Sequence, residues 1–178
     1  MNAAPRTPDD FIPLILYEGN VDLRGPASVR SDPRFAGGDK RPEHGLLEIL
    51  IVENDPQISA ILKDIIEIDG AYRVTGIATD LAETMAAIEA HRPGLALIDM
   101  HLGGVATGIE VAVRALEAGV PTLFSTGNPL PFPVPELALG CLCKPYTCYS
   151  VSQSLRIVEQ IIRGVPVDPQ VPLELELY

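Results

Sequence analysis

Short runs of consecutive hydrophobic residues alternate with helical stripes along most of the chain. The runs are rich in Ile, Leu and Val and lie at residues 49–52, 72–77, 95–99, 121–125 and 141–143. Between them, apolar residues recur three and four positions apart, which is the spacing of one face of a helix. Buried strands that alternate with amphipathic helices predict a parallel sheet with helices on both faces. We therefore expect an α/β fold with five parallel strands.

Helix start signals lie between these runs. Asp55 followed by Pro56 predicts an N-cap and a first helical residue. The capping-box pattern occurs at residues 80–83 and again at residues 107–110. A last amphipathic helix is expected over residues 147–163.

Prolines interrupt the pattern at residues 128–135, where they occupy every second position. Each proline lacks a backbone donor and disfavours helix in the residue before it. We therefore expect the helix between the fourth and fifth strands to be shortened or lost.

The alternating pattern covers residues 46–163, which we expect to form one domain. An N-terminal extension, residues 1–45, contains an apolar patch at residues 11–17, and a C-terminal tail follows at residues 164–178. The end of this tail alternates apolar and acidic residues with the period of a strand. It is therefore expected to pair with a sheet edge or with the patch at 11–17, and frayed ends are the alternative.

Composition limits the classes of function. A chain of 178 residues that is 47% hydrophobic can bury one core and still carry extensions. With 24 acidic and 13 basic residues, its net charge of -11 repels DNA and anionic membranes. We expect no direct binding of nucleic acid. The absence of a secretory signal and of an apolar run of about 18 residues favours a cytoplasmic protein without a membrane segment.

Cysteines and histidines give no catalytic pattern. The three cysteines are an odd number within eight positions, which fits neither a disulfide framework nor a paired zinc motif. We therefore expect core or surface positions for Cys141, Cys143 and Cys148. The histidines are scattered, and we expect surface or loop positions for the side chains of His44, His91 and His101.

Polar residues follow the carboxyl ends of four predicted strands. Glu53 and Asn54 follow the first, Asp99 ends the third, Ser125 and Thr126 end the fourth, and Lys144 with Pro145 follows the fifth. Ligands of an open parallel sheet bind beyond these ends. Transfer of a phosphoryl group to a carboxylate needs an exposed Asp, a divalent cation and further positive charge. The pattern therefore predicts a phosphoryl-accepting site.

Each residue has an expected role in this site. Asp99 is the predicted nucleophile, and Glu53 and Asn54 would help to hold the cation. Lys144 would bind a phosphoryl oxygen, and the hydroxyl of Thr126 or Ser125 would donate to the same oxygens. The backbone carbonyl of His101 is a further metal ligand, and Pro145 is a candidate cis residue that would aim the lysine.

These segments together resemble the bacterial response-regulator receiver domain over about residues 46–163. The matching segments are Ile-Leu-Ile-Val-Glu-Asn-Asp-Pro, Leu-Ile-Asp-Met-His-Leu, Phe-Ser-Thr-Gly and Cys-Lys-Pro-Tyr. The resemblance implies a doubly wound, flavodoxin-like fold and Mg²⁺ dependence. It also implies phosphoryl transfer from a histidine kinase or histidine phosphotransferase, and slow self-dephosphorylation. It assigns the phosphoacceptor to Asp99, the acidic metal pair to Glu53 and Asn54, the signalling hydroxyl to Thr126 and the lysine to Lys144.

Three features depart from the family pattern. Asn54 replaces an anionic ligand with a neutral one, so we expect weak Mg²⁺ binding. Cys141 stands where receivers usually carry the Tyr or Phe of the switch. The proline segment alters the face that receivers most often use for output. An unusual partner or an unusual homodimer geometry is therefore expected.

Three functions are compatible with these residues. The first is a stand-alone receiver that is phosphorylated and signals through protein contacts, without being an enzyme. The second is a degenerate receiver that binds partners without phosphorylation. The third is a phosphohydrolase of the haloacid-dehalogenase type. That fold has its nucleophile after the first core strand and a second Asp two positions on, whereas here the acceptor follows the third strand and position 101 is His.

Overall fold

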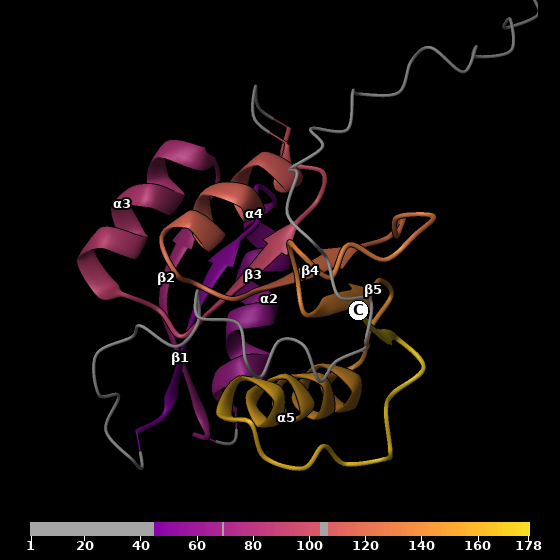
Figure 1. The fold of residues 1–178 in the computed structure, drawn as a ribbon. Coiled ribbons are helices and arrows are strands. Elements are labelled where there is room, and N and C mark those ends of the chain that lie inside the picture. Colours follow the sequence, from indigo (N-terminus) through magenta and orange to yellow (C-terminus); the bar gives the residue numbers. More distant parts are fainter. Residues whose placement is uncertain (1–44, 69, 104–106) are drawn as a thin grey trace, which may run out of the picture.

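The computed structural model describes residues 45–68, 70–103 and 107–178 of the chain. Strands and helices alternate along these residues (Figure 1). The elements in chain order are β1 (Leu47–Val52), α2 (Pro56–Glu67), β2 (Tyr72–Ala78), α3 (Leu81–His91), β3 (Leu95–Asp99), α4 (Gly108–Glu117), β4 (Thr122–Thr126), β5 (Gly140–Cys143), α5 (Cys148–Arg163) and β6 (Leu175–Leu177). The five predicted strands are confirmed, and β6 is a sixth.

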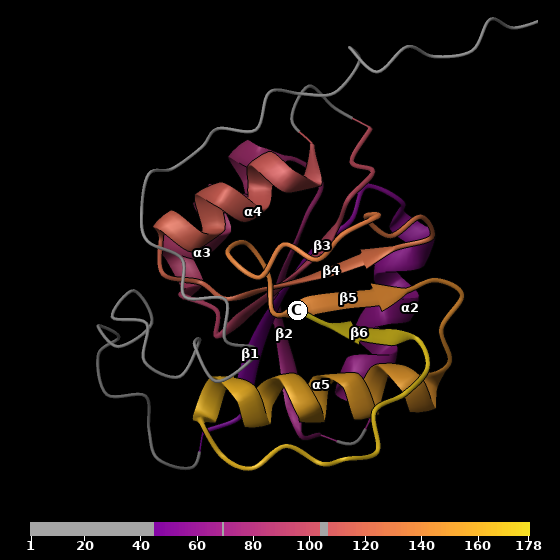
Figure 2. The ribbon, with the colours of Figure 1, turned by 45° about the vertical axis from the view of Figure 1, so that its right-hand side comes forward.

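The strands form one sheet with the order β2-β1-β3-β4-β5-β6. All neighbouring pairs from β2 to β5 are parallel, and β6 runs antiparallel to β5 at the edge (Figure 2). The chain reverses its direction across the sheet between β1 and β3, as in other doubly wound sheets. The predicted doubly wound α/β fold is confirmed.

Two hydrophobic cores lie on the two faces of the sheet. Helices α2 and α5 cover one face, where Leu62, Ile66 and Leu155 are buried against the strands. Helices α3 and α4 cover the other face, where Ile88 and Val111 pack onto β1, β3 and β4. Because both faces are covered, the central strands are apolar on both sides, which explains the unbroken hydrophobic runs in the sequence.

The helix start signals act as the sequence predicts, with one exception. The Asp55 carboxylate accepts hydrogen bonds from the amides of the first turn of α2, and Thr107 and Glu110 form a reciprocal capping box at α4. The predicted capping box at residues 80–83 forms only in part. Asp80 caps α3, but the Glu83 carboxylate accepts from the backbone and hydroxyl of Thr79 instead.

The proline segment contains no helix, which confirms the predicted loss. Between β4 and β5 the chain runs through bends and a turn, and its carbonyl at Leu137 accepts a hydrogen bond from Thr122. Val134 and Ala138 are buried in the core on the side of α3 and α4. The segment therefore still covers the sheet, although it cannot supply a helical surface there.

The C-terminal tail pairs with a sheet edge, which is one of the arrangements that its alternating sequence predicted. Leu175 of β6 is buried against the core on the side of α2 and α5, and Tyr178 packs on the other core. The apolar patch at residues 11–17 lies outside the described residues. Within the described part of the chain, no helix combines the length and apolar character needed to cross a bilayer.

Candidate functional site

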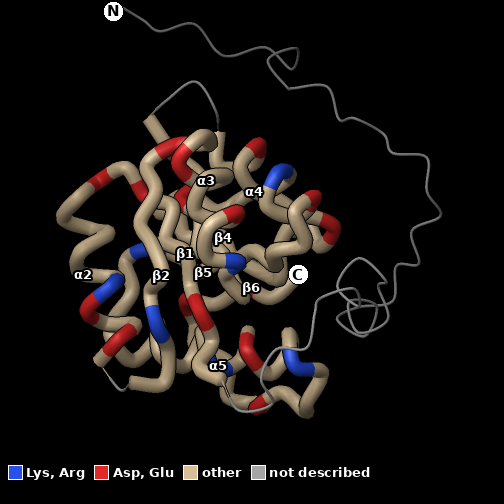
Figure 3. The backbone as a smooth tube through the Cα atoms, turned by 90° about the vertical axis from the view of Figure 1, so that its left-hand side faces the viewer, with Lys and Arg blue, Asp and Glu red and all other residues tan. Residues whose placement is uncertain are grey.

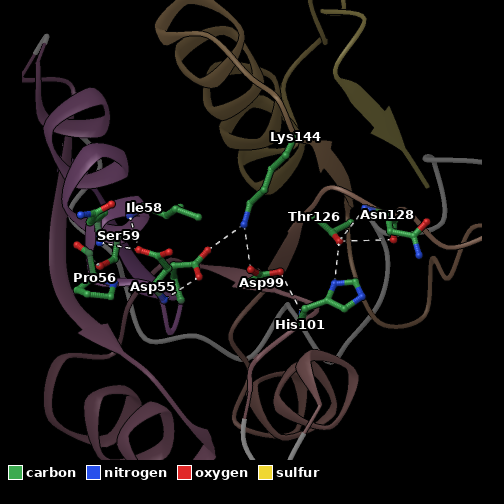
Figure 4. Close-up of polar contacts among 11 residues, drawn as sticks. Asp55, Pro56, Ile58, Ser59, Asp99, His101, Thr126, Asn128 and Lys144 are labelled. Atoms are coloured by element: carbon green, nitrogen blue, oxygen red, sulfur yellow. Dashed lines mark hydrogen bonds and ion pairs between the residues drawn. The ribbon is translucent and has the colours of Figure 1, made fainter.

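Four strands bring polar side chains to one end of the sheet. Because β1, β3, β4 and β5 are parallel, their carboxyl ends meet at the same edge, and Glu53 lies there, directly after β1. Figure 4 shows Asp99, Thr126 and Lys144 at the same edge. The Lys144 Nζ atom is 2.9 Å from Glu53 Oε2 and 2.9 Å from Asp99 Oδ2. Segments more than 40 positions apart in the sequence therefore share one ammonium group.

Both carboxylates of this cluster are buried. Glu53 is 2% exposed and Asp99 is 7% exposed, whereas the Lys144 side chain keeps 21% of its surface accessible. Two anionic groups at this depth repel each other and lose hydration, and a shared cation offsets that cost. The backbone amide of Lys144 donates to the carbonyl of Thr126 at 2.8 Å, which fixes the start of the lysine side chain. The Lys144–Pro145 bond is cis, as predicted.

Each carboxylate is oriented by the backbone amide two residues further along the chain. Asp55 N donates to Glu53 Oε1 and His101 N donates to Asp99 Oδ1, both at 3.0 Å. One oxygen of each group is therefore fixed by a turn, while the other oxygen meets Lys144. This arrangement holds the Asp99 carboxylate in one orientation beside the ammonium group.

The charges of the cluster support one another. Burial by itself would raise the pKa of Asp99, but the hydrogen bond from the His101 amide and the Lys144 ammonium outweigh it and hold the pKa below its usual value. Burial by itself would lower the pKa of Lys144, but its hydrogen bonds to Asp99 and Glu53 raise the pKa above its usual value. Asp99 is therefore an anion and Lys144 a cation at neutral pH.

The Thr126 hydroxyl is held by a partner that the sequence reasoning did not identify. Thr126 is fully buried, and its Oγ1 lies 3.3 Å from His101 Nδ1 and accepts from the Asn128 amide at 3.2 Å. Figure 4 shows the His101 ring pointing toward this hydroxyl. The sequence assigned His101 only a backbone role, because spacing along the chain gives no sign that its ring meets β4.

Two glycines shape the loop after Asp99. A Cβ on Gly108 would lie 2.3 Å from the Asp99 carbonyl oxygen, so only glycine lets α4 begin against the end of β3. A Cβ on Gly103 would lie 2.9 Å from the Asn54 side-chain nitrogen. The neighbours of Gly108 are backbone atoms that cannot give way, whereas the neighbour of Gly103 is the end of a side chain that can shift.

Comparisons with known proteins agree with this geometry. Residues 49–130 match the family described as response regulator receiver domain. The chain therefore carries a response regulator receiver domain. A CheY-like receiver domain protein from Methanospirillum hungatei superimposes with a TM-score of 0.57 at 28% identity, over 67% of this chain and 96% of that one.

Two curated relatives of the receiver domain are longer proteins. The phyllosphere-induced regulator PhyR of Methylorubrum extorquens is 34% identical over 110 residues, which cover 59% of this chain and 40% of that protein. Protein-glutamate methylesterase/protein-glutamine glutaminase 3 of Hahella chejuensis is 35% identical over 71 residues, covering 40% of this chain and 20% of that protein. This chain thus spans less than half of either relative.

The remaining predicted site residues lie around the receiver domain's acidic cluster or away from it. The Asn54 side chain is exposed next to Glu53, and Ser125 is buried with no hydrogen-bond partner for its hydroxyl among the described residues. Cys141 lies opposite Phe124 on β4, in the core on the side of α3 and α4. Burial raises the pKa of the Cys141 thiol to about 12, so the group stays protonated.

Proposed function

We propose that this receiver domain accepts a phosphoryl group on Asp99 from a histidine kinase or histidine phosphotransferase and signals through protein contacts. The observation that carries the proposal is the Lys144 ammonium, which lies 2.9 Å from both the Asp99 and the Glu53 carboxylates. A lone acid at a strand end would not need this arrangement. A nucleophile that must later carry a dianionic phosphoryl group does need a cation beside it.

The chain's own residues fit the transfer step. In this step a phosphohistidine P–N bond breaks, a P–O bond to an Asp99 oxygen forms, and the histidine nitrogen of the donor takes up a proton. The lowered pKa of Asp99 keeps the attacking oxygen unprotonated. Lys144 would turn from the carboxylates to the new phosphoryl oxygens, and Thr126 would exchange its contact with His101 for a hydrogen bond to them.

The same residues suit Mg²⁺. We propose that the carboxylates of Glu53 and Asp99, the side chain of Asn54 and the backbone carbonyl of His101 would hold the ion, which would neutralise donor oxygens during transfer. The oxygen-rich donor set fits Mg²⁺, and the close approach of Asn54 to Gly103 places the amide over the loop that follows Asp99. Because Asn54 is neutral, affinity should be lower than with two acids beside Asp99.

Acetyl phosphate with Mg²⁺ tests the proposal directly. We expect a mass increase of one phosphoryl group on the wild-type chain and no increase in Asp99→Asn, with Asp64→Asn on α2 as a matched control that keeps the wild-type result. Peptide mapping should place the group on Asp99. An unmodified wild-type chain, shown to be folded and given ample Mg²⁺, would contradict the proposal.

A phosphorylation-independent interaction module is the second candidate. It is favoured by the neutral Asn54, by Cys141 in place of the switch aromatic and by the Thr126 hydroxyl, which already has its partner in His101. In that case, the wild-type chain and Asp99→Asn would bind a partner equally well, with or without acetyl phosphate. A partner affinity that changes only in the wild-type chain would exclude this candidate.

A further inference from the structure

The outer edge of β5 is covered by the chain's own C-terminal strand. In the register of this antiparallel pair, Gly140 is opposite Leu177, Cys141 is opposite Glu176 and Leu142 is opposite Leu175. Two further backbone bonds extend the pair, from Cys143 N to the Glu174 carbonyl at 2.7 Å and from Tyr178 N to the Leu139 carbonyl at 3.1 Å. Pairing with the tail therefore extends along the whole length of β5 on this side.

Few side chains hold this strand in place. Leu175 is the only fully buried residue of β6, while Leu177 and Tyr178 are partly exposed. The Tyr178 side chain packs on the core on the side of α3 and α4, where its buried hydroxyl lies near the Cys141 thiol. A three-residue strand with one buried anchor belongs to the least stable parts of a fold.

The connection to β6 allows the strand to leave while the linker stays attached. After α5, Gln160 accepts hydrogen bonds from Val165 N and Asp168 N, each at 3.0 Å, and so ties the first part of the linker to the helix. The rest of the linker contains Pro169 and Pro172 and follows the outside of the domain (Figure 2). Strand exchange would therefore alter only the chain after Asp168.

Gly140 adapts the edge of β5 to an approaching backbone. A Cβ at this position would lie 2.3 Å from the Glu176 carbonyl oxygen and 3.2 Å from the Leu177 Cα atom. Glycine inside a strand marks places where another backbone comes close. The clash would arise with any strand paired in this register, whichever chain supplies it.

We propose that the β5 edge is a strand-docking surface for an extended segment of a partner protein, and that residues 174–178 cover it in the unbound state. Main-chain pairing would supply affinity, and apolar side chains in the places of Leu175 and Leu177 would supply specificity. The inference goes beyond phosphorylation at Asp99 and does not depend on it.

Charge indicates the chemistry of the partner segment. The net charge of -11 disfavours a second copy of this chain, and acidic positions are spread over most elements (Figure 3). The resident strand itself places Glu174 and Glu176 between its leucines. A partner segment with apolar residues at alternate positions and basic residues between them would fit this surface better than the resident strand does.

A synthetic peptide of residues 172–178 is the probe for this surface, with a second peptide that carries Glu174→Lys and Glu176→Lys. Fluorescence anisotropy would measure the binding of each peptide to the full chain and to a chain ending at Pro172. Because a tethered strand competes at an effective concentration of about millimolar, we expect at least ~10-fold tighter binding to the shortened chain. The lysine peptide should bind more tightly than the native one, and this difference should shrink with added salt.

Two variants make the test independent of folding defects. Gly140→Ala in the shortened chain should abolish peptide binding, whereas Gly127→Ala, whose Cβ would meet only the Lys144 Cβ at 3.9 Å, should not. If the shortened chain does not fold, Leu175→Asp in the full chain removes the one buried anchor and should raise peptide affinity in the same way.

Three results would overturn the proposal. A folded shortened chain, or a folded Leu175→Asp chain, that fails to bind either peptide would show that the β5 edge accepts no strand. Equal or tighter binding by the full chain would place the peptide elsewhere, such as the outer edge of β6. Self-association of the full chain that disappears on shortening would identify a second copy, rather than a separate partner, as the occupant.

Discussion

The two halves of the sheet are covered by different kinds of structure. The half that contains β2, β1 and β3 is bounded by the regular helices α2, α3 and α4, and it carries Glu53 and Asp99. The half that contains β4, β5 and β6 lacks a helix between β4 and β5 and gains an antiparallel strand at its edge. The acidic site of the receiver domain thus lies on a regular framework, whereas the surface beside Lys144 is built from a proline segment and a tail.

One glycine in each half has another backbone equally close to its Cα atom, so the two positions allow the halves to be compared. A Cβ on Gly108 and a Cβ on Gly140 would each lie 2.3 Å from a backbone carbonyl oxygen. The oxygen that a Cβ on Gly108 would strike belongs to the end of β3, which is held between neighbouring strands in the centre of the sheet and cannot move away. Behind the clash at Gly140 is the terminal strand β6, which can move away. An alanine at either position would overlap a carbonyl oxygen to the same extent, but we expect it to lower the free energy of unfolding more at Gly108 than at Gly140.

Gly108→Ala should have the largest effect. The added methyl group would force Asp99 and Met100 away from α4, so we expect a loss of about 3 kcal/mol of unfolding free energy. Urea unfolding followed by circular dichroism would measure it, with Gly127→Ala as the control near zero. A loss below about 1 kcal/mol would show that the end of β3 is as adaptable as the sheet edge.

Lys144→Met should have the next largest effect. The variant leaves two buried carboxylates without their shared cation, and we expect a loss of about 2 kcal/mol, less than for a fully buried pair because the lysine is 21% exposed. The same unfolding experiment applies, with Lys63→Met as the control. Lys63 lies 3.9 Å from Glu67 on an exposed helix face, where such pairs contribute little. Equal stability of the two variants would contradict the shared-cation interpretation.

The sequence predicted the regular half more fully than the irregular half. Hydrophobic runs and capping residues are local signals, so β3 and the start of α2 were placed to the residue. The convergence of Glu53, Asp99 and Lys144 was also predictable, because parallel strands must end at one edge of the sheet.

Contacts set by three-dimensional packing were not predictable from local signals. The meeting of the His101 ring with Thr126 depends on the path of the loop after β3, and the choice of the β5 edge by the tail depends on what remains uncovered. The alternation in the tail predicted pairing with a sheet edge but did not say which edge. Gly140 is a local sign that this edge is β5, since glycine in a short apolar run marks a close backbone approach.

Gly140→Ala should cost about 1 kcal/mol in the full chain, because β6 can detach and limit the strain. The same substitution in the chain ending at Pro172 should cost nothing measurable, since the atoms that it strikes are then absent. This double-mutant comparison isolates the contact between Gly140 and β6. A similar cost in both chains would place the strain within β5 itself and remove the distinction between the two halves.

The smallest expected effect concerns the pH dependence of stability that Asp99 contributes. Its pKa in the folded chain lies below the usual value of 3.8 because the His101 amide and Lys144 outweigh burial. The folded state therefore binds fewer protons than the unfolded state around that pH. The resulting stabilisation is complete above the unfolded pKa and is lost as the pH falls through the folded one.

Asp99→Asn should consequently lose less stability than the wild type between about pH 5 and the acid limit of folding. Unfolding free energies measured across this range would show the difference. Parallel curves for the wild type and Asp99→Asn would mean that Lys144 does not favour the ionised form of Asp99, and the regular half would then lack the electrostatic pairing that sets it apart from the β5 and β6 edge.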